Sequence, residues 1–232
     1  IIEEPMPAGI VSPQGKKIYM IAFVIGIGIP LGIIFLLNLL RFRIEGHTDV
    51  EKLTKVPIIG DIPLTGSNKH EESAIAVREN DNDIMTETFR SLRTNLLFMM
   101  GDPDKKVVLV TSTISGEGKT FIASNLALSL ALLGKKVILV GLDIRKPGLN
   151  KLFHLSHKEK GITQYLAAPK STDLHALIQP SGITSNLDLL LGGPIPPNPT
   201  ELLARQSLED TISTLRKESV SYTHLRAHET SQ

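Results

Sequence analysis

Several residue types are missing or scarce in this chain. It contains no cysteine and no tryptophan, and aromatic residues make up only 4% of it. The absence of cysteine excludes disulfides and thiolate metal sites, and the scarcity of aromatic rings disfavours surfaces that stack on sugars or bases. Basic and acidic residues nearly balance, 25 against 24, so the composition does not indicate a nucleic-acid partner.

Residues 18–40 form the longest run without a charged residue. A helix rising about 1.5 Å per residue would reach roughly 35 Å over this run, enough to cross the hydrocarbon core of a membrane. Backbone polar groups in lipid must pair internally, so we predict a transmembrane helix, with residues 1–17 extracytoplasmic. The excess of basic residues after the run favours a cytoplasmic C-terminal side: Lys16 and Lys17 precede it, and Arg41, Arg43, Lys52 and Lys55 follow.

Residues 41–82 mix proline, glycine and charge, a composition typical of a linker next to the membrane. Asp83 is a suitable N-cap for a helix, because apolar residues then recur at helical spacing: Met85, Phe89, Leu92, Leu96 and Met99. Glu87, Arg90 and Arg93 lie off this apolar stripe, each three residues from the next. Their spacing alone predicts a solvated helix face.

The centre of the chain alternates between strand and helix patterns. Residues 105–112, KKVVLVTS, predict a buried strand, and residues 119–134 predict an apolar helix closed by Gly134. Residues 135–143 predict a second strand, and 186–193, NLDLLLGG, a third. Strand, glycine-rich loop, helix and strand make a βαβ unit, which implies a parallel sheet with helices on its faces. Asn198, Pro199 and Glu201 then mark another helix start.

The loop between the first strand and its helix predicts a phosphate site. Gly116, Gly118, Lys119 and Thr120 fit the end of the pattern G-x-x-x-x-G-K-[ST], although Thr113 stands at its first glycine. Glycine lets backbone N–H groups close on phosphate oxygens, and the helix N-terminus adds a positive dipole. Lysine at this position reaches the β- and γ-phosphates, and the threonine hydroxyl binds Mg²⁺.

Asp143 ends the second predicted strand, in GLDIRKP. A carboxylate at the C-terminal end of a parallel strand points into the crevice where ligands bind, so it is a candidate to hold Mg²⁺ through water or to orient a nucleophile. The alternative is a helix cap for the segment that follows. Arg145 and Lys146 either contact phosphate or face solvent.

Together and in this order, these motifs resemble the bacterial tyrosine kinases of the Wzc-like polysaccharide co-polymerase family. The resemblance covers about residues 5–218, and its segments are ETFRSLRTNLLF, TSTISGEGKT, VILVGLDIRKPGLNKLF and GGPIPPNPTELL. It implies an α/β fold: a transmembrane helix followed by a P-loop NTPase-type parallel-sheet domain similar to MinD and ParA. It also implies a bacterial inner (plasma) membrane location, with the P-loop domain cytoplasmic.

The resemblance assigns roles to individual residues. The family's Walker A loop, which binds ATP with Mg²⁺, matches Ser115, Gly116, Glu117, Gly118, Lys119 and Thr120. The implied catalytic residues are Lys119, Asp143 and Arg145, and the implied metal-site residues are Thr120 and Asp143. The family motif E-x-x-R-x-x-R, which mediates ring-like self-association in relatives, matches Glu87, Arg90 and Arg93. The signature lysine that MinD and ParA carry early in the P-loop has no counterpart here, which favours the kinase branch.

The sequence departs from the family pattern in two places. Asp143 matches the second aspartate of D-x-D-x-R, but Gly141 stands at the first. The family also has a Walker B strand and later a tyrosine-rich tail, whereas residues 219–232 read SVSYTHLRAHETSQ, which we predict to be a non-native or disordered tail. The chain begins at Ile1, and these features together predict a segment with an incomplete P-loop domain at 83–218, weak or no nucleotide binding and no autophosphorylation.

The expected function is that of a membrane-anchored, ATP-dependent protein-tyrosine autokinase that regulates capsular or extracellular polysaccharide polymerisation and export. The expected partners are other copies of the chain, the polymerase and export machinery, and a phosphotyrosine phosphatase, with no nucleic acid. Two alternatives stay open. One is a non-enzymatic chain-length regulator with a nucleotide-dependent assembly domain, and the other is a MinD/ParA-like ATPase fused to a membrane anchor.

Overall fold

The computed structural model describes residues 15–40, 46–63, 75–79, 81–102, 104–114, 116–155, 160–218 and 221–225. The chain forms two compact units, Ile1–Pro57 and Ile58–Gln232. Most of the predicted extracytoplasmic segment and part of the predicted C-terminal tail lie outside the described residues.

The first unit contains helix α1 (Gly15–Leu40) and the short helix α2 (His47–Leu53). Of the described helices, α1 alone is long and apolar enough to cross a membrane, and none of its apolar stretch is buried within the protein. The predicted helix over 18–40 is therefore confirmed as a helix, and it continues through Pro30. Helix α2 lies in a segment that the sequence predicted to be linker.

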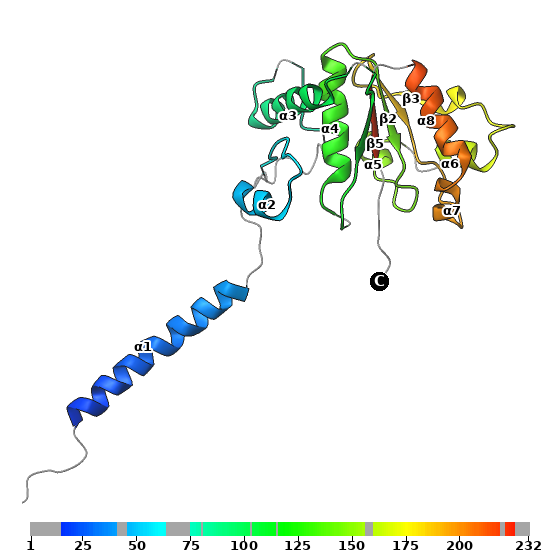
Figure 1. Ribbon diagram of the computed structural model, residues 1–232. Coiled ribbons are helices and arrows are strands. Elements are labelled where there is room, and N and C mark those ends of the chain that lie inside the picture. Colours follow the sequence, from blue (N-terminus) through cyan, green and yellow to red (C-terminus); the bar gives the residue numbers. More distant parts are fainter. Residues whose placement is uncertain are drawn as a thin grey trace, which may run out of the picture. The chain divides into compact units, whose positions relative to one another are not determined.

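The second unit is built on a five-stranded sheet with the strand order β1-β5-β2-β4-β3 (Figure 1). The pairs β1–β5, β5–β2 and β2–β4 are parallel, and β3 is antiparallel to β4. In chain order the strands are β1 (Val107–Val110), β2 (Val137–Gly141), β3 (Ile178–Pro180), β4 (Leu187–Leu190) and β5 (Ser221–Leu225). The carboxyl ends of the four parallel strands meet at one edge, which is where ligands bind in sheets of this kind.

Helices cover both faces of the sheet (Figure 1). In chain order they are α3 (Ile84–Met100), α4 (Lys119–Leu132), α5 (Leu149–Leu152), α6 (Ile162–Ala167), the 3₁₀ turn η1 (His175–Leu177), α7 (Pro199–Leu203) and α8 (Gln206–Glu218). Every residue of β2 is buried, and its side chains alternate between two cores. Val137 and Leu139 join a core with α3 and α4, whereas Ile138 and Val140 join one with α6, α7 and α8. Burial on both faces explains the continuous apolar run of this strand.

The predicted strands and helices of this unit are confirmed, with two corrections to burial. The strand predicted over 105–112 is β1, but it is not buried: Val107 and Leu109 are 39% and 53% exposed. It lies at the edge of the described sheet, where one face lacks a covering helix among the described residues. Met99, the last residue of the predicted apolar stripe, is also exposed, because it lies at the C-terminal end of α3.

Strand β5 was not predicted. It lies between β1 and β2, where Leu225 pairs with Gly141, and its sequence SYTHL contains no carboxylate. The Walker B strand of the resembled family ends in aspartate, and this strand does not supply one. Strand β3 and helices α5 and α6 were also missed, because they are too short to show a period in the sequence.

Candidate nucleotide-binding site

Two glycines shape the loop between β1 and α4. Gly116 and Gly118 have φ angles of 94° and 86°, in the left-handed region that favours glycine. A Cβ on either residue would meet no atom within 4 Å, so their conformation and not crowding requires glycine. Gly118 is the N-cap of α4, and the first amides of this helix therefore point toward the loop. Ser115 lies outside the described residues.

Lys119 folds back over this loop. Its ammonium Nζ donates to Ser112 Oγ at 2.8 Å and to the Ile114 carbonyl at 3.4 Å. The positive charge is thus held over the loop, near the amides of the α4 N-terminus. A phosphate oxygen bound there would accept hydrogen bonds from the ammonium and from these amides.

The loop already binds one anionic group, the carboxylate of Glu117. Its Oε2 accepts from the backbone N–H of Thr113 at 3.1 Å and of Ile114 at 3.2 Å. Hydrogen bonds from the Ile114 N–H, the Ser112 hydroxyl and the Thr113 N–H, together with the charge of Lys119, lower the pKa of Glu117, and burial opposes them. The loop therefore offers a field that favours negative oxygen atoms, which is what a nucleotide phosphate requires.

We expect this contact to depend on pH. Because the folded-state pKa of Glu117 is lowered, the contact is fully present above the ordinary carboxyl pKa and is lost as the pH falls through the lowered value. An acid titration followed by NMR should move the Thr113 and Ile114 amide signals in a single step. The Glu117→Gln variant should show no such step, and Glu87→Gln, which changes an exposed carboxylate elsewhere, should keep it. An unchanged step in Glu117→Gln would contradict the contact.

The loop that follows β2 approaches the α4 N-terminus. A Cβ on Gly148 would lie 3.3 Å from Thr120 Oγ1, so the two segments are in contact. Asp143 lies in this loop. Its carboxylate accepts a hydrogen bond from the Lys146 N–H at 3.0 Å, which closes the turn. Asp143 is not the helix cap that the sequence offered as the alternative, because the N-cap of the following helix α5 is Gly148. The Asp143 carboxylate stays at the ligand-binding edge of the sheet. Arg145 is exposed in the same turn.

The described residues hold no group of three His, Asp or Glu side chains that could hold a metal ion on their own. Mg²⁺ is usually held by one or two protein oxygens together with water and substrate phosphates. The Thr120 hydroxyl and the Asp143 carboxylate are oxygen donors of the kind Mg²⁺ prefers, and both lie at the carboxyl edge of the sheet. These residues fit a Mg²⁺ that is shared with phosphates.

Gly141 has little room for the aspartate found in the resembled family. A Cβ there would lie 2.9 Å from Leu149 Cδ1 and 3.3 Å from the Gly192 nitrogen. The side chain of Leu149 can move, but the backbone of Gly192 is fixed by the loop after β4. The close packing of Leu149 and Gly192 around this position therefore favours glycine.

We expect Gly141→Asp to lower the free energy of unfolding by about 1–3 kcal/mol, because an added side chain overpacks this position. Urea denaturation would measure the loss. In the double variant with Leu149→Ala the two losses should not add, because the smaller residue provides the missing space. Strict additivity would show that Leu149 is not the obstacle.

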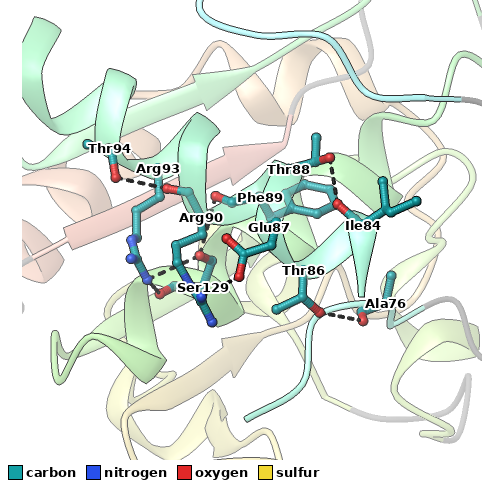
Figure 2. Close-up of polar contacts among 10 residues, drawn as sticks. All are labelled: Ala76, Ile84, Thr86, Glu87, Thr88, Phe89, Arg90, Arg93, Thr94 and Ser129. Carbon is teal, nitrogen blue, oxygen red and sulfur yellow. Dashed lines mark hydrogen bonds and ion pairs between the residues drawn. The ribbon is translucent and has the colours of Figure 1, made fainter. Parts of the chain in front are cut away.

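The three residues of the E-x-x-R-x-x-R motif do not share one environment (Figure 2). Glu87 and Arg90 form an ion pair, and their side chains are about half exposed. Arg93 instead lies against α4, where its Nη1 donates to the Ser129 carbonyl at 2.8 Å and contacts Ser129 Oγ at 3.4 Å. The solvated face predicted from spacing describes Glu87 and Arg90, but not Arg93.

A separate pocket of about 410 Å³ lies between α6, α7 and the loop after β4. Its lining includes Thr163, Gln164, Asn198, Glu201 and Arg205. Only the proline-rich run before α7 hints at this pocket in the sequence.

Comparison with known proteins agrees with this geometry. The ParA family model, described as a NUBPL iron-transfer P-loop NTPase, matches residues 104–183. Tyrosine-protein kinase YwqD of Bacillus subtilis is 37% identical over 143 residues, which are 62% of this chain and 58% of that protein. Tyrosine-protein kinase etk of Escherichia coli K12 is 27% identical over 229 residues, which are 91% of this chain and 30% of that protein.

Solved structures give the same result. The kinase domain of Escherichia coli tyrosine kinase ETK superposes with a TM-score of 0.69 at 26% identity, over 81% of this chain and 74% of that one. The chimerical protein CapA2B2 superposes with a TM-score of 0.68 at 28% identity, over 81% and 77%.

The second unit is therefore an α/β domain of the P-loop NTPase type, a fold that binds nucleotides. More particularly, the chain is a homologue of the bacterial tyrosine-protein kinases, and its fold is that of their kinase domains. It spans 58% of the length of YwqD and 30% of etk. The fold class and the family resemblance expected from the sequence are confirmed.

Proposed function

We propose that this chain is the membrane-anchored, nucleotide-binding part of a protein-tyrosine autokinase that regulates capsular or extracellular polysaccharide polymerisation and export. The observation that supports the proposal is the loop before α4, where the left-handed Gly116 and Gly118 precede Lys119, whose ammonium folds back onto the loop. The homologues named tyrosine-protein kinases support the choice of reaction. Helix α1 holds the protein in the bacterial plasma membrane, and the excess of basic residues after it favours a cytoplasmic P-loop unit.

The residues of the site have the following proposed roles. The loop amides and Lys119 bind the β- and γ-phosphates, and the Thr120 hydroxyl holds Mg²⁺. Asp143 holds the metal through water or orients the acceptor hydroxyl, and Arg145 contacts phosphate. Bound Mg²⁺–ATP supplies the phosphoryl group and neutralises the charge of the phosphates. The bond from the γ-phosphorus to the bridging oxygen would break and leave ADP, while a new bond would form to a tyrosine oxygen, whose proton would pass to water.

The proposed acceptor is a tyrosine of a neighbouring copy in a ring. Glu87 and Arg90 contribute to this self-association, and the proposed partners are the polysaccharide polymerase and export machinery and a phosphotyrosine phosphatase. Catalysis in such a site depends mainly on positioning and charge neutralisation, so a loop that already orients its amides is well suited to it.

The test is made on the intact protein in its native membrane, incubated with Mg²⁺–ATP. We expect phosphotyrosine, detected by mass spectrometry, together with release of ADP. Release of inorganic phosphate without phosphotyrosine would instead favour an ATPase, an alternative that the match to the ParA model supports. If neither product forms and the polysaccharide length still depends on the protein, the kinase proposal is wrong and the non-enzymatic regulator replaces it. Gly141, in place of the family's aspartate, keeps that alternative open.

A further inference from the structure

The C-terminal turn of α4 leaves carbonyls for partners outside the helix, and Asn186 Nδ2 donates to that of Ala131 at 3.3 Å. Past the last helical residue, the Leu133 N–H donates to Leu130 at 3.1 Å and the Gly134 N–H donates to Ala131 at 2.9 Å. The Lys135 N–H also donates to Leu130, at 3.3 Å. These bonds bypass the carbonyl of Ser129. The last carbonyls of a helix need such partners, and the turn carries the negative end of the helix dipole.

Arg93 supplies the partner. Its guanidinium donates to the Ser129 carbonyl from α3, a helix that is distant in sequence. Burial, and the charge of Arg90, lower the pKa of Arg93, but a guanidinium remains protonated in proteins. Arg93 Nε is buried and makes no hydrogen bond within the described residues, a desolvation cost that the bond to Ser129 has to offset. A cation at a helix C-terminus is favourable, as at the last turn of many helices.

Further contacts fix the two helices together (Figure 2). Ser129 Oγ donates to the Phe89 carbonyl at 3.4 Å. Phe89 is fully buried, and its ring meets that of Phe121 edge-on with centroids 5.7 Å apart. Phe121 follows Thr120 directly, so α3 contacts α4 both next to the candidate phosphate loop and at the far end.

We propose that Arg93 acts within its own subunit as the residue that caps and positions the P-loop helix. The three residues of the motif then have two different roles. Glu87 and Arg90 are exposed and available to a second copy, whereas Arg93 connects their helix to α4. The positioning half of this inference rests on the proposed function, because it assumes that α4 begins at a nucleotide site.

The proposal that Arg93 caps α4 can be tested without any nucleotide. Hydrogen exchange is measured on the full chain in detergent, at a concentration where it is monomeric, for wild type, Arg93→Ala, Arg93→Lys, Arg90→Ala and Leu92→Ala. We expect Arg93→Ala to speed exchange of the Leu133, Gly134 and Lys135 amides about tenfold, with partial rescue by Arg93→Lys. Arg90→Ala should leave these amides unchanged, and Leu92→Ala should speed exchange evenly along α4.

Two results would overturn the cap. One is wild-type exchange of these amides in Arg93→Ala, and the other is an even rise along α4 like that of Leu92→Ala. The positioning half is tested by titrating Mg²⁺–ADP into the same variants. Arg93→Ala should bind about threefold more weakly than wild type, and Arg90→Ala should bind as wild type. Equal affinity in Arg93→Ala and wild type overturns positioning. A wild type that binds no ADP refutes both positioning and the proposed function, while the exchange result still decides the cap.

Discussion

Replacing Lys119 with methionine should weaken the binding of Mg²⁺–ATP about 10- to 100-fold. Methionine has a similar length and keeps α4 helical, but it removes the positive charge that the structure holds over the loop at Ser112 and Ile114. A hydrogen bond to a charged group is worth about 1.5–3 kcal/mol, which corresponds to that range of affinity. Isothermal titration calorimetry with a non-hydrolysable ATP analogue would measure it.

The matched control is Lys170→Met, which removes the same charge from an exposed turn. It should bind the analogue as wild type does, and both variants should unfold at the same urea concentration as wild type. If Lys119→Met keeps wild-type affinity while it is folded, the loop before α4 is not the phosphate site.

The largest effect on stability should come from Gly161→Ala. A Cβ at this position would lie 2.4 Å from both the Gly193 nitrogen and the Leu191 carbonyl oxygen, which are backbone atoms. Neither atom can move freely, because the start of α6 is bonded to this loop through Ile162 N to Leu191 O at 2.8 Å and Thr163 N to Gly192 O at 3.1 Å. We expect a loss of about 3–5 kcal/mol, or failure to fold.

Urea denaturation followed by circular dichroism would measure this loss, with Gly182→Ala as the comparison. Gly182 has a φ of 75° but open space around its Cβ position, so alanine there should cost only about 1–2 kcal/mol of backbone strain. A Gly161→Ala protein as stable as Gly182→Ala would mean that the approach of α6 to the loop after β4 is looser than the structure describes.

Some elements of the fold were predictable because a short stretch of sequence is enough to indicate each of them. The apolar run gave α1, the strand pattern around VILVG gave β2, and the glycines followed by Lys119 gave the turn into α4. Short elements with no period, such as β5, were not predictable. The exposure of β1 was missed as well, since burial depends on what covers a strand and not on the strand's own sequence.

The candidate site was predictable in its residue types but not in its contacts. Spacing placed Arg93 on the same face as Arg90, because helical periodicity cannot reveal that α4 packs beside it. Glu117 was predicted as part of the Walker A loop, yet its bonds to two loop amides depend on the left-handed backbone at Gly116 and Gly118. The crowding at Gly141 arises from Leu149 and Gly192, which are brought together only by the sheet.

The central claim is that the loop between β1 and α4 binds nucleotide phosphates. Its most direct test is an NMR titration of the labelled protein with Mg²⁺–ADP. We predict that the largest changes occur at the amides of Gly116, Gly118, Lys119 and Thr120. Changes confined to the pocket between α6 and α7, around Thr163 and Gln164, with the loop amides unmoved, would contradict the account.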